Sequence, residues 1–197
     1  WELFKNKTQE NNVAVNKYLW KASLEVLSFL PVQSIDPFTG VIVTGYGTPP
    51  GGGTAYRATV LIDTTFSASE LNVRLTVSRT LDQLSNFQIA PDFQFTVEIV
   101  LAELLNNIVE HAYCGRDDGE IHLKATILDD KLRIETIDQG VKMPGLKAPH
   151  PPEPNLDVDR QDLPEGQFGW FMIRKLSEDL EYKRANSKNH LTISITH

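Results

Sequence analysis

The sequence has little cysteine, no excess of positive charge and no long apolar run. Its 197 residues include one cysteine, which excludes an intrachain disulfide, and no cysteine–histidine cluster has zinc-site spacing. Nineteen basic and 26 acidic residues give a net charge of −7, which argues against direct nucleic-acid binding. No apolar run reaches the roughly 20 residues of a membrane span and no signal-peptide pattern is present, so we expect no membrane span.

The most informative segment is residues 98–111. Apolar residues recur there at three- and four-residue steps, which predicts an amphipathic helix. On this helix Glu103, Asn107 and His111 are spaced by four residues and share one face. A carboxylate can take up a proton, and an amide oxygen is a hard ligand that suits Mg²⁺. Taken alone, such a face is more typical of a solvated polar stripe, and two later segments change this balance.

These two segments place glycines at the ends of regular structure. Asp138 and Gly140 follow an alternating run that predicts a strand, where a buried carboxylate can accept a hydrogen bond from an exocyclic amine. Gly166 and Gly169 precede an apolar helical run, whose N-terminal N–H groups can bind phosphate. Each pattern alone is also typical of an ordinary turn or cap. The ordered set of three is far more specific.

In this order the three patterns resemble the N, G1 and G2 boxes of the GHKL ATPases. Residues 62–197 are most similar to the anti-sigma-factor serine/threonine kinase branch of that superfamily. The similarity is carried by Ala-Glu-Leu-Leu-Asn-Asn-Ile-Val-Glu-His-Ala-Tyr (102–113) and Phe-Gly-Trp-Phe-Met-Ile-Arg (168–174). It implies ATP and Mg²⁺ as cofactors, with Asn107 as the Mg²⁺ ligand. It also implies Glu103 as the general base toward a serine or threonine hydroxyl of a partner.

The resemblance also implies roles for the remaining site residues. Asp138 is expected to bind the adenine amine. Gly140, Gly166 and Gly169 are expected to allow close approach of base and phosphates. Two residues keep alternatives open. His111 either contacts a phosphate or packs the helix end. Arg174 contacts a phosphate or, as we favour, an acid of the segment 141–165, which corresponds to the ATP lid of GHKL proteins.

The resemblance predicts a protein-serine/threonine kinase of GHKL type. Such a kinase phosphorylates a serine or threonine of an anti-sigma antagonist protein, controls a sigma factor in the cytoplasm and can form a homodimer. The alternative is a non-catalytic, nucleotide-dependent binding module that sequesters a sigma factor or another partner. Glu103 distinguishes the two, because a pure binder needs no base there. A second rival is a fusion in which the ATP fold is vestigial.

The first third of the chain has a separate resemblance. Residues 16–24, 36–43 and 45–50 resemble an uncharacterised domain of alphaproteobacterial envelope lipoproteins, although the lipid-bearing cysteine is absent. We therefore expect two parts, an N-terminal segment 1–62 of unknown function and an ATP-binding kinase-like domain 63–197. An envelope origin conflicts with ATP dependence, so the first part is either fused or a relic used as scaffold.

The predicted fold class is α+β: a two-layer α/β sandwich of Bergerat type. It has a mixed, mainly antiparallel sheet with helices on one face, plus an N-terminal helix-and-strand segment. Helices are predicted at 13–30, from Ser67 or Ser69 to 84, at 93–113 with Asp92 as cap, and at 168–177. Strands are predicted at 41–44, 56–62, 120–128, 132–137, 181–184 and 191–196. Residues 141–165 contain six prolines and correspond to the ATP lid of GHKL proteins.

Overall fold

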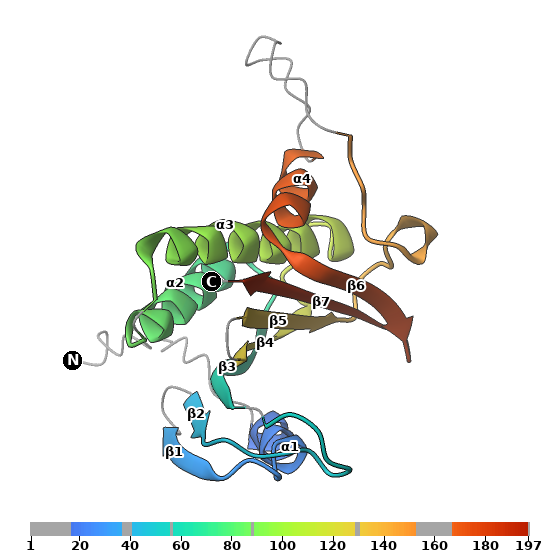
Figure 1. The fold of residues 1–197 in the computed structure, drawn as a ribbon. Helices are drawn as coiled ribbons and strands as arrows, with labels where there is room; N and C mark the ends of the chain where they lie inside the picture. Colours follow the sequence, from blue (N-terminus) through green and yellow to red (C-terminus); the bar gives the residue numbers. More distant parts are fainter. Residues whose placement is uncertain are drawn as a thin grey trace, which may run out of the picture.

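The computed structural model describes residues 17–36, 41–55, 57–87, 89–128, 131–152 and 167–196. In this part of the chain, seven strands form one sheet in the order β1-β2-β3-β4-β5-β7-β6 (Figure 1). Every pairing within it is antiparallel. The strands are β1 (Val32–Asp36), β2 (Val41–Thr44), β3 (Ala58–Ser67), β4 (Glu120–Leu128), β5 (Lys131–Asp138), β6 (Glu178–Ala185) and β7 (Lys188–Thr196).

Three helices lie over one face of this sheet. They are α2 (Glu70–Ser85), α3 (Pro91–Asn107) and α4 (Gln167–Leu176), whereas α1 (Lys17–Val26) lies beside β1 and β2 (Figure 1). Apolar side chains of the three helices and of the sheet form one buried core between the two layers. This arrangement confirms the predicted α+β sandwich with a mainly antiparallel sheet.

Strand register brings the later site residues together. In β4, Ile121, Leu123 and Ala125 alternate toward the core, as the period-two pattern predicts. Ile121 pairs with Asp138 on β5, and Asp138 pairs with Asn189 on β7. The hairpin of β4 and β5 agrees with the predicted strands 120–128 and 132–137. Its position places Asp138 and Asn189 side by side at one end of the sheet.

Helix α2 begins where predicted, but two of the leucines expected in the core are exposed. Ser69 is its N-cap. The spacing predicts an inward side made of Leu71, Leu75, Val77, Leu81 and Leu84. Val77 and Leu84 are buried and Leu81 packs against the core, but Leu71 and Leu75 are 53% and 39% exposed, so the prediction is wrong for these two residues. The buried side consists of Val73, Thr76, Val77, Thr80 and Leu84. Thr80 can occupy it because its hydroxyl bonds to the helix backbone: Thr80 Oγ1 donates to Thr76 O at 2.9 Å.

Helix α3 differs from the prediction at both ends. Asp92 is not the cap: the N-cap is Ala90, followed by Pro91, whose missing N–H costs little in the first turn. Asp92 lies in that first turn, where its charge complements the helix dipole. At the other end the α-helix stops at Asn107 and continues as a π-helical turn, η1 (Ile108–Ala112). The π-helical turn, not the predicted α-helix, carries His111.

Several smaller differences concern element lengths. Helix α1 ends at Val26, earlier than the predicted end at residue 30, and the predicted start at residue 13 lies outside the described residues. Strand β3 extends to Ser67, beyond the predicted strand 56–62. The predicted strands 181–184 and 191–196 lie within β6 and β7. These shifts change no pairing on which the site depends.

The N-terminal segment shares the sheet and also contacts its outer face, the face opposite α2 and α3. Strand β2 pairs with β3, where Ile42 lies opposite Val60. From α1, Ser23 Oγ donates to a carboxylate oxygen of Asp63 on β3. The other oxygen of Asp63 lies 2.8 Å from His122 Nε2 on β4, and Asp63 is only 1% exposed. The expected boundary between residues 62 and 63 falls inside β3, and the division into 1–62 and 63–197 stays a prediction.

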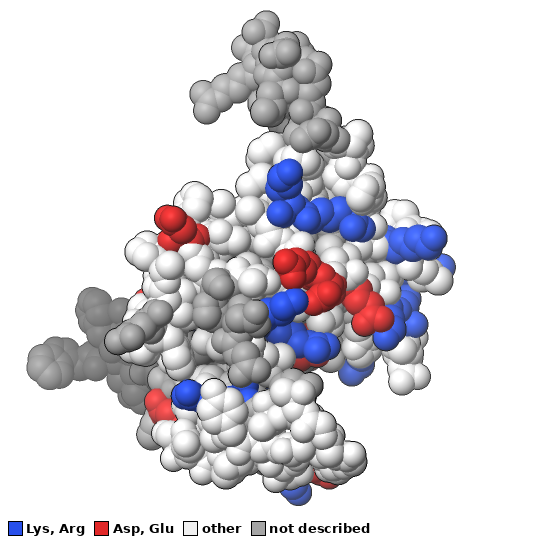
Figure 2. Space-filling view, in the orientation of Figure 1, with Lys and Arg blue, Asp and Glu red and all other residues white. Residues whose placement is uncertain are grey.

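Charged side chains of both signs lie side by side on the face seen in Figure 2. Lys131 pairs with Glu178 at 3.0 Å and with Asp179 at 3.4 Å, and Lys183 pairs with Glu181 at 2.7 Å. All of these side chains are well exposed, so each pair contributes little to stability.

Candidate functional site

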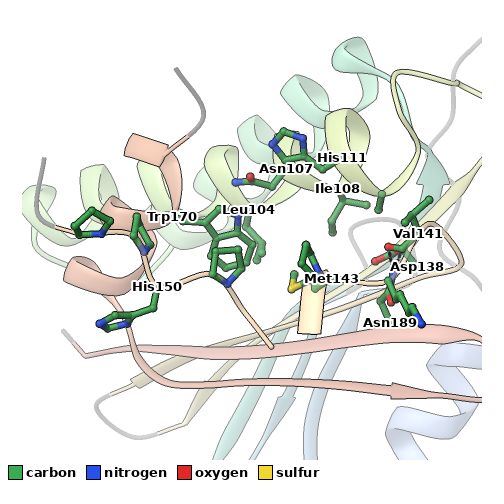
Figure 3. A pocket seen from close by; sticks show the side chains of 16 residues that line it. Leu104, Asn107, Ile108, His111, Asp138, Val141, Met143, His150, Trp170 and Asn189 are labelled. Atoms are coloured by element: carbon green, nitrogen blue, oxygen red, sulfur yellow. Dashed lines mark hydrogen bonds between the residues drawn. The ribbon is translucent and has the colours of Figure 1, made fainter. Parts of the chain in front are cut away.

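A cavity of about 600 Å³ lies between the end of α3, helix α4, the start of β7 and the segment that follows β5 (Figure 3). Its wall contains three of the predicted site residues, Asn107, His111 and Asp138. Most of the remaining wall is apolar. The apolar lining residues are Leu104, Ile108, Ala112, Val141, Met143, Pro144, Pro149, Pro151, Pro152 and Trp170. Such a mixture of apolar walls and a few polar groups is typical of a small-molecule site.

Asn107 stands at the point where α3 changes into the π-helical turn. Its Nδ2 donates to the backbone oxygen of Glu103 at 2.6 Å. Because the amide nitrogen is engaged, the orientation of the carboxamide is fixed and Oδ1 remains available as a ligand atom. π-Helical turns inside α-helices occur often at functional sites. Here the turn displaces His111 from the position that a regular α-helix would give it.

Glu103 lies between α3 and α4 and does not line the cavity wall. A Cβ atom at Gly169 would overlap its Oε2, and would lie 3.5 Å from Asn107 Nδ2. Gly169 belongs to the first turn of α4, so the carboxylate is packed against that helix start. Burial raises the pKa of Glu103, and the nearby charge of Glu110 raises it further.

Asp138 ends β5 with one carboxylate oxygen bound and one open. Oδ1 accepts the N–H of Gly140 at 2.8 Å and Nδ2 of Asn189 at 2.7 Å. Oδ2 accepts no hydrogen bond within the described part of the chain, although the residue is only 5% exposed. Burial raises the pKa of Asp138, which the hydrogen bonds from Asn189 and Gly140 partly offset. The open oxygen is therefore an acceptor that a donor of a ligand can satisfy.

Gly140 has a packing role that the sequence did not reveal. A Cβ atom there would overlap the carbonyl group of Ala112, the last residue of the π-helical turn. The next residue, Val141, donates its N–H to the same carbonyl at 2.7 Å. Glycine thus allows the segment after β5 to contact the end of the helix directly. Its expected role in the approach of the base stays a prediction.

The other predicted site residues lie as follows. His111 is exposed and lines the cavity, so it does not pack beneath the helix end. Gly166 lies outside the described residues, and Gly169 lies beside Glu103. Arg174 donates from Nε to Pro149 O at 2.5 Å and from Nη2 to Ala148 O at 3.0 Å. It therefore contacts the backbone of the lid. The lid acids at 153–165 are outside the described residues, so the favoured contact with one of them stays a prediction.

Several residues of the site carry no local signal in the sequence. Asn189, Tyr182 and Arg184 from β6 and β7 form hydrogen bonds around Asp138 and the residues that follow it. Lys142 and His150 add basic groups to the cavity wall. No local motif marks these residues, because strand pairing and the path of the lid place them there. Only the pairing register of β6 and β7 with β5, inferred from their alternating side chains, could have indicated that these residues lie near Asp138.

The donor set fits an adenine nucleotide with Mg²⁺. The open acceptor of the largely buried Asp138 matches an exocyclic amine, and the free oxygen of Asn107 matches a hard cation. No group of three or more His, Cys, Asp or Glu side chains able to hold a metal occurs among the described residues. A single protein ligand is compatible with Mg²⁺, because this ion is often held mainly by substrate phosphates and water.

None of the described helices has both the length and the apolar character needed to cross a membrane.

Comparison with known proteins agrees with this geometry. The family described as the histidine kinase-like ATPase domain matches residues 66–195. The chain belongs to this family. It is 30% identical over 101 residues to the serine/threonine-protein kinase BtrW of Bordetella bronchiseptica, which covers 51% of this chain and 69% of that protein. It is 29% identical over 106 residues to the serine-protein kinase RsbW of Bacillus licheniformis, which covers 51% of this chain and 61% of that protein. The predicted resemblance to the kinase branch of the GHKL ATPases is thereby confirmed.

A second match covers the N-terminal half. Residues 13–113 match a family described only as a domain of unknown function, DUF3576, and the chain belongs to that family as well. The uncharacterized protein RP420 of Rickettsia prowazekii is 48% identical over 42 residues, which is 21% of this chain and 25% of that protein. The two family matches overlap over residues 66–113, so they do not place a boundary at residue 62. The lipoprotein character of this segment stays a prediction.

Proposed function

We propose that the chain binds ATP with Mg²⁺ in the cavity of Figure 3 and phosphorylates a serine or threonine hydroxyl of a partner protein. The proposed partner is a regulatory protein of the anti-sigma antagonist type, through which the kinase controls a sigma factor in the cytoplasm. A homodimer is part of the same proposal. One observation carries it: an open carboxylate oxygen of the largely buried Asp138 and an open amide oxygen of Asn107 face one apolar cavity.

The adenine ring of the nucleotide would bind at the Asp138 end of the cavity. An ionised carboxylate can only accept hydrogen bonds, so its open oxygen selects a donor such as an exocyclic amine. Ile108, Val141 and Met143 supply apolar surface beside it for the faces of a planar ring (Figure 3). A bound ligand would cover this acceptor, so a ligand that leaves it unpaired would lose the full desolvation cost.

The phosphates would bind toward α3 and α4. Asn107 Oδ1 would hold the cation, whose positive charge offsets charge on the phosphates in the transition state. The first-turn N–H groups of α4 are suited to a phosphate, since they point away from the helix and carry partial positive charge. Lys142 on the cavity wall adds a full positive charge in a chain whose net charge is −7.

Glu103 is the group we propose to take the proton from the attacking hydroxyl. Its raised pKa makes it a stronger base than an ordinary glutamate once it is ionised. Packing against Gly169 holds the carboxylate at the start of α4, the same helix end that would bind the phosphate. The general base Glu103 and the phosphate would thus be positioned by one contact between two helices.

Calorimetric titration with ADP and a non-hydrolysable ATP analogue, with and without Mg²⁺, tests the proposal. We expect magnesium-dependent binding, and we expect Asp138→Asn to weaken adenine nucleotides while leaving pyrophosphate binding within about twofold, because the change touches only the base end. Absence of nucleotide binding at millimolar concentration would overturn the proposed function.

One observation favours the binding module as a second candidate. Glu103 lies against α4 outside the cavity wall, so the nucleotide site is complete without it. Glu103→Gln keeps the size of the side chain and removes the base. For a kinase we expect nucleotide affinity within a few-fold and phosphoryl transfer reduced at least about a hundredfold. Equal transfer by both proteins would remove Glu103 from the mechanism, and no transfer by either would favour the binding module.

A further inference from the structure

A hydrogen-bonded network surrounds the bound oxygen of Asp138. Asp138 and Asn189 are paired residues of β5 and β7 and are 5% and 4% exposed. Asn189 Oδ1 accepts from Tyr182 Oη at 2.7 Å and from Arg184 Nη1 at 2.6 Å. Its Nδ2 donates to Asp138 Oδ1 at 2.7 Å and to Val141 O at 3.1 Å. All the polar atoms of this asparagine therefore have partners.

The chemistry of the neighbours fixes the direction of this network. A guanidinium group can only donate, so the asparagine atom beside Arg184 must be the oxygen. A backbone carbonyl and an ionised carboxylate can only accept, so the atom beside Val141 and Asp138 must be the nitrogen. An aspartate at position 189 would place a second acceptor against Asp138, and an alanine would leave Oδ1 of Asp138 with one donor fewer. Asparagine satisfies both sides at once.

The network also determines which oxygen is left for a ligand. Gly140 N–H and Asn189 Nδ2 both bind Oδ1, and together they hold the carboxylate plane with Oδ2 open. A purine with a 6-amino group presents a donor to this oxygen. Hypoxanthine presents a 6-oxo group, a second acceptor, which cannot pair with it.

Resting on the proposed nucleotide binding, we propose that Asn189 is a specificity-determining positioning residue. It fixes Asp138 so that the cavity prefers a purine bearing a 6-amino group over a 6-oxo purine. Asn189 acts through Asp138 and needs no contact with the ligand. The same asparagine binds the backbone at Val141, so the residue that selects the base also holds the start of the lid.

The test compares ATP and inosine triphosphate in calorimetric titrations of the whole chain. For the unaltered protein we expect ATP to bind at least about tenfold more tightly, because a bound 6-oxo purine would cover Oδ2 of Asp138 and leave it unpaired. In Asn189→Ala this ratio should fall to about threefold or less, mainly through weaker ATP binding. Asn86→Ala is the matched control, since the amide of Asn86 also donates to a backbone carbonyl but on the exposed end of α2.

Two further measurements separate positioning from a merely structural role. The hydrogen bond from Asn189 lowers the pKa of Asp138, and Arg184 and His190 also lower it. In Asn189→Ala the first of these causes is lost and the other two remain, so the pKa of Asp138 should rise. The pH below which ATP affinity is lost should therefore move upward. Asn189→Ser keeps a hydroxyl donor and should retain most of the ATP preference even if the alanine variant is poorly folded.

The outcomes are distinguishable. Parallel weakening of ATP and inosine triphosphate in Asn189→Ala, with an unchanged ratio and pH limit, would overturn the role of Asn189 and leave the proposed function intact. Loss of preference in Asn189→Ser equal to that of a folded Asn189→Ala would also overturn it. Failure of the unaltered chain to bind either nucleotide would overturn the proposed function itself.

Discussion

The carboxylate of Glu103 occupies the space in which a side chain on Gly169 would lie. The two residues come from different helices and are 66 positions apart in the sequence. This contact explains why position 169 requires glycine, since any larger residue would displace the carboxylate of Glu103, the proposed general base. It also links the N box and the second glycine of the G2 box by contact rather than by sequence pattern.

Gly169→Ala is therefore expected to destabilise the protein although alanine is the better helix former. In a helix without the contact, the same change is neutral or stabilises by up to about 1 kcal/mol. We expect a lowered melting temperature and phosphoryl transfer reduced at least tenfold, because a displacement of about 1 Å at the reacting centre has costs of this order or more.

A double-mutant cycle tests the cause. In a Glu103→Ala background the obstructing carboxylate is absent, so Gly169→Ala should no longer lower the melting temperature. Equal destabilisation in both backgrounds would show that Gly169 is constrained by another neighbour.

The pH dependence of phosphoryl transfer should report the environment of Glu103. A general base works in its ionised form, so activity should fall as pH decreases through its pKa. Burial first and Glu110 second raise that pKa, and the acid limb should therefore lie at higher pH than for an ordinary glutamate. Glu110→Gln removes the second cause and should move the limb to lower pH without abolishing transfer.

Glu98→Gln is the matched control, since Glu98 lies on the same helix but is not among the groups that shift the pKa of Glu103. An acid limb that moves equally in both variants would contradict the assignment of Glu103 as the titrating base.

The sequence predicted those features that short-range pattern controls. The β4–β5 hairpin follows from alternation along single strands, and the cap of α2 could be limited to Ser67 or Ser69 because an N-cap lies next to the helix it caps. The face of α2 could not be predicted in the same way. Leu71 and Leu75 have the right spacing for a core stripe, but they are exposed, whereas Val73, Thr76 and Thr80 are buried. Packing, not apolar character alone, decided the orientation.

The candidate site shows the same division. Asp138 was recognisable because an acid and a glycine end a strand. Asn189 was not, because its importance arises from pairing with a strand about 50 residues earlier. The reason for Gly140 was also hidden, since the Ala112 carbonyl that it contacts lies at the end of a π-helical turn that no periodicity indicated.

Arg174 is expected to hold the first part of the lid against α4. Its guanidinium donates to the carbonyls of Ala148 and Pro149, and a methionine side chain has no donor to replace either bond. In Arg174→Met, backbone amides in the segment 145–150 should exchange about tenfold faster in hydrogen-exchange measurements, as the loss of roughly 1.4 kcal/mol of local stability implies.

Lys175→Met provides the control, because Lys175 is the exposed neighbour of Arg174 on the same helix. Unchanged protection of 145–150 in Arg174→Met would show that other contacts, such as that of Met143 N–H with Tyr182 Oη at 3.1 Å, are sufficient.

The N-terminal segment should contribute to stability but not to nucleotide binding. A protein that begins at Thr54 retains all of β3 and every predicted box. It lacks Ser23, which donates to the buried carboxylate of Asp63, and Thr44, which binds Ala58 O at 2.8 Å and Ala58 N–H at 3.0 Å. It also lacks Ile42, which is fully buried. Because one unsatisfied buried polar group costs about 1–3 kcal/mol, the truncated protein should melt well below the whole chain.

Ser23→Ala in the whole chain isolates one part of that cost, since it removes only the hydroxyl partner of Asp63. We expect a melting temperature between those of the whole chain and the protein beginning at Thr54, with nucleotide affinity within about twofold in all three. Calorimetry and thermal melting on the same samples would check both quantities. A truncated protein that is folded yet binds no nucleotide would show that residues before 54 belong to the site, and the division of the chain into two functional parts would be wrong.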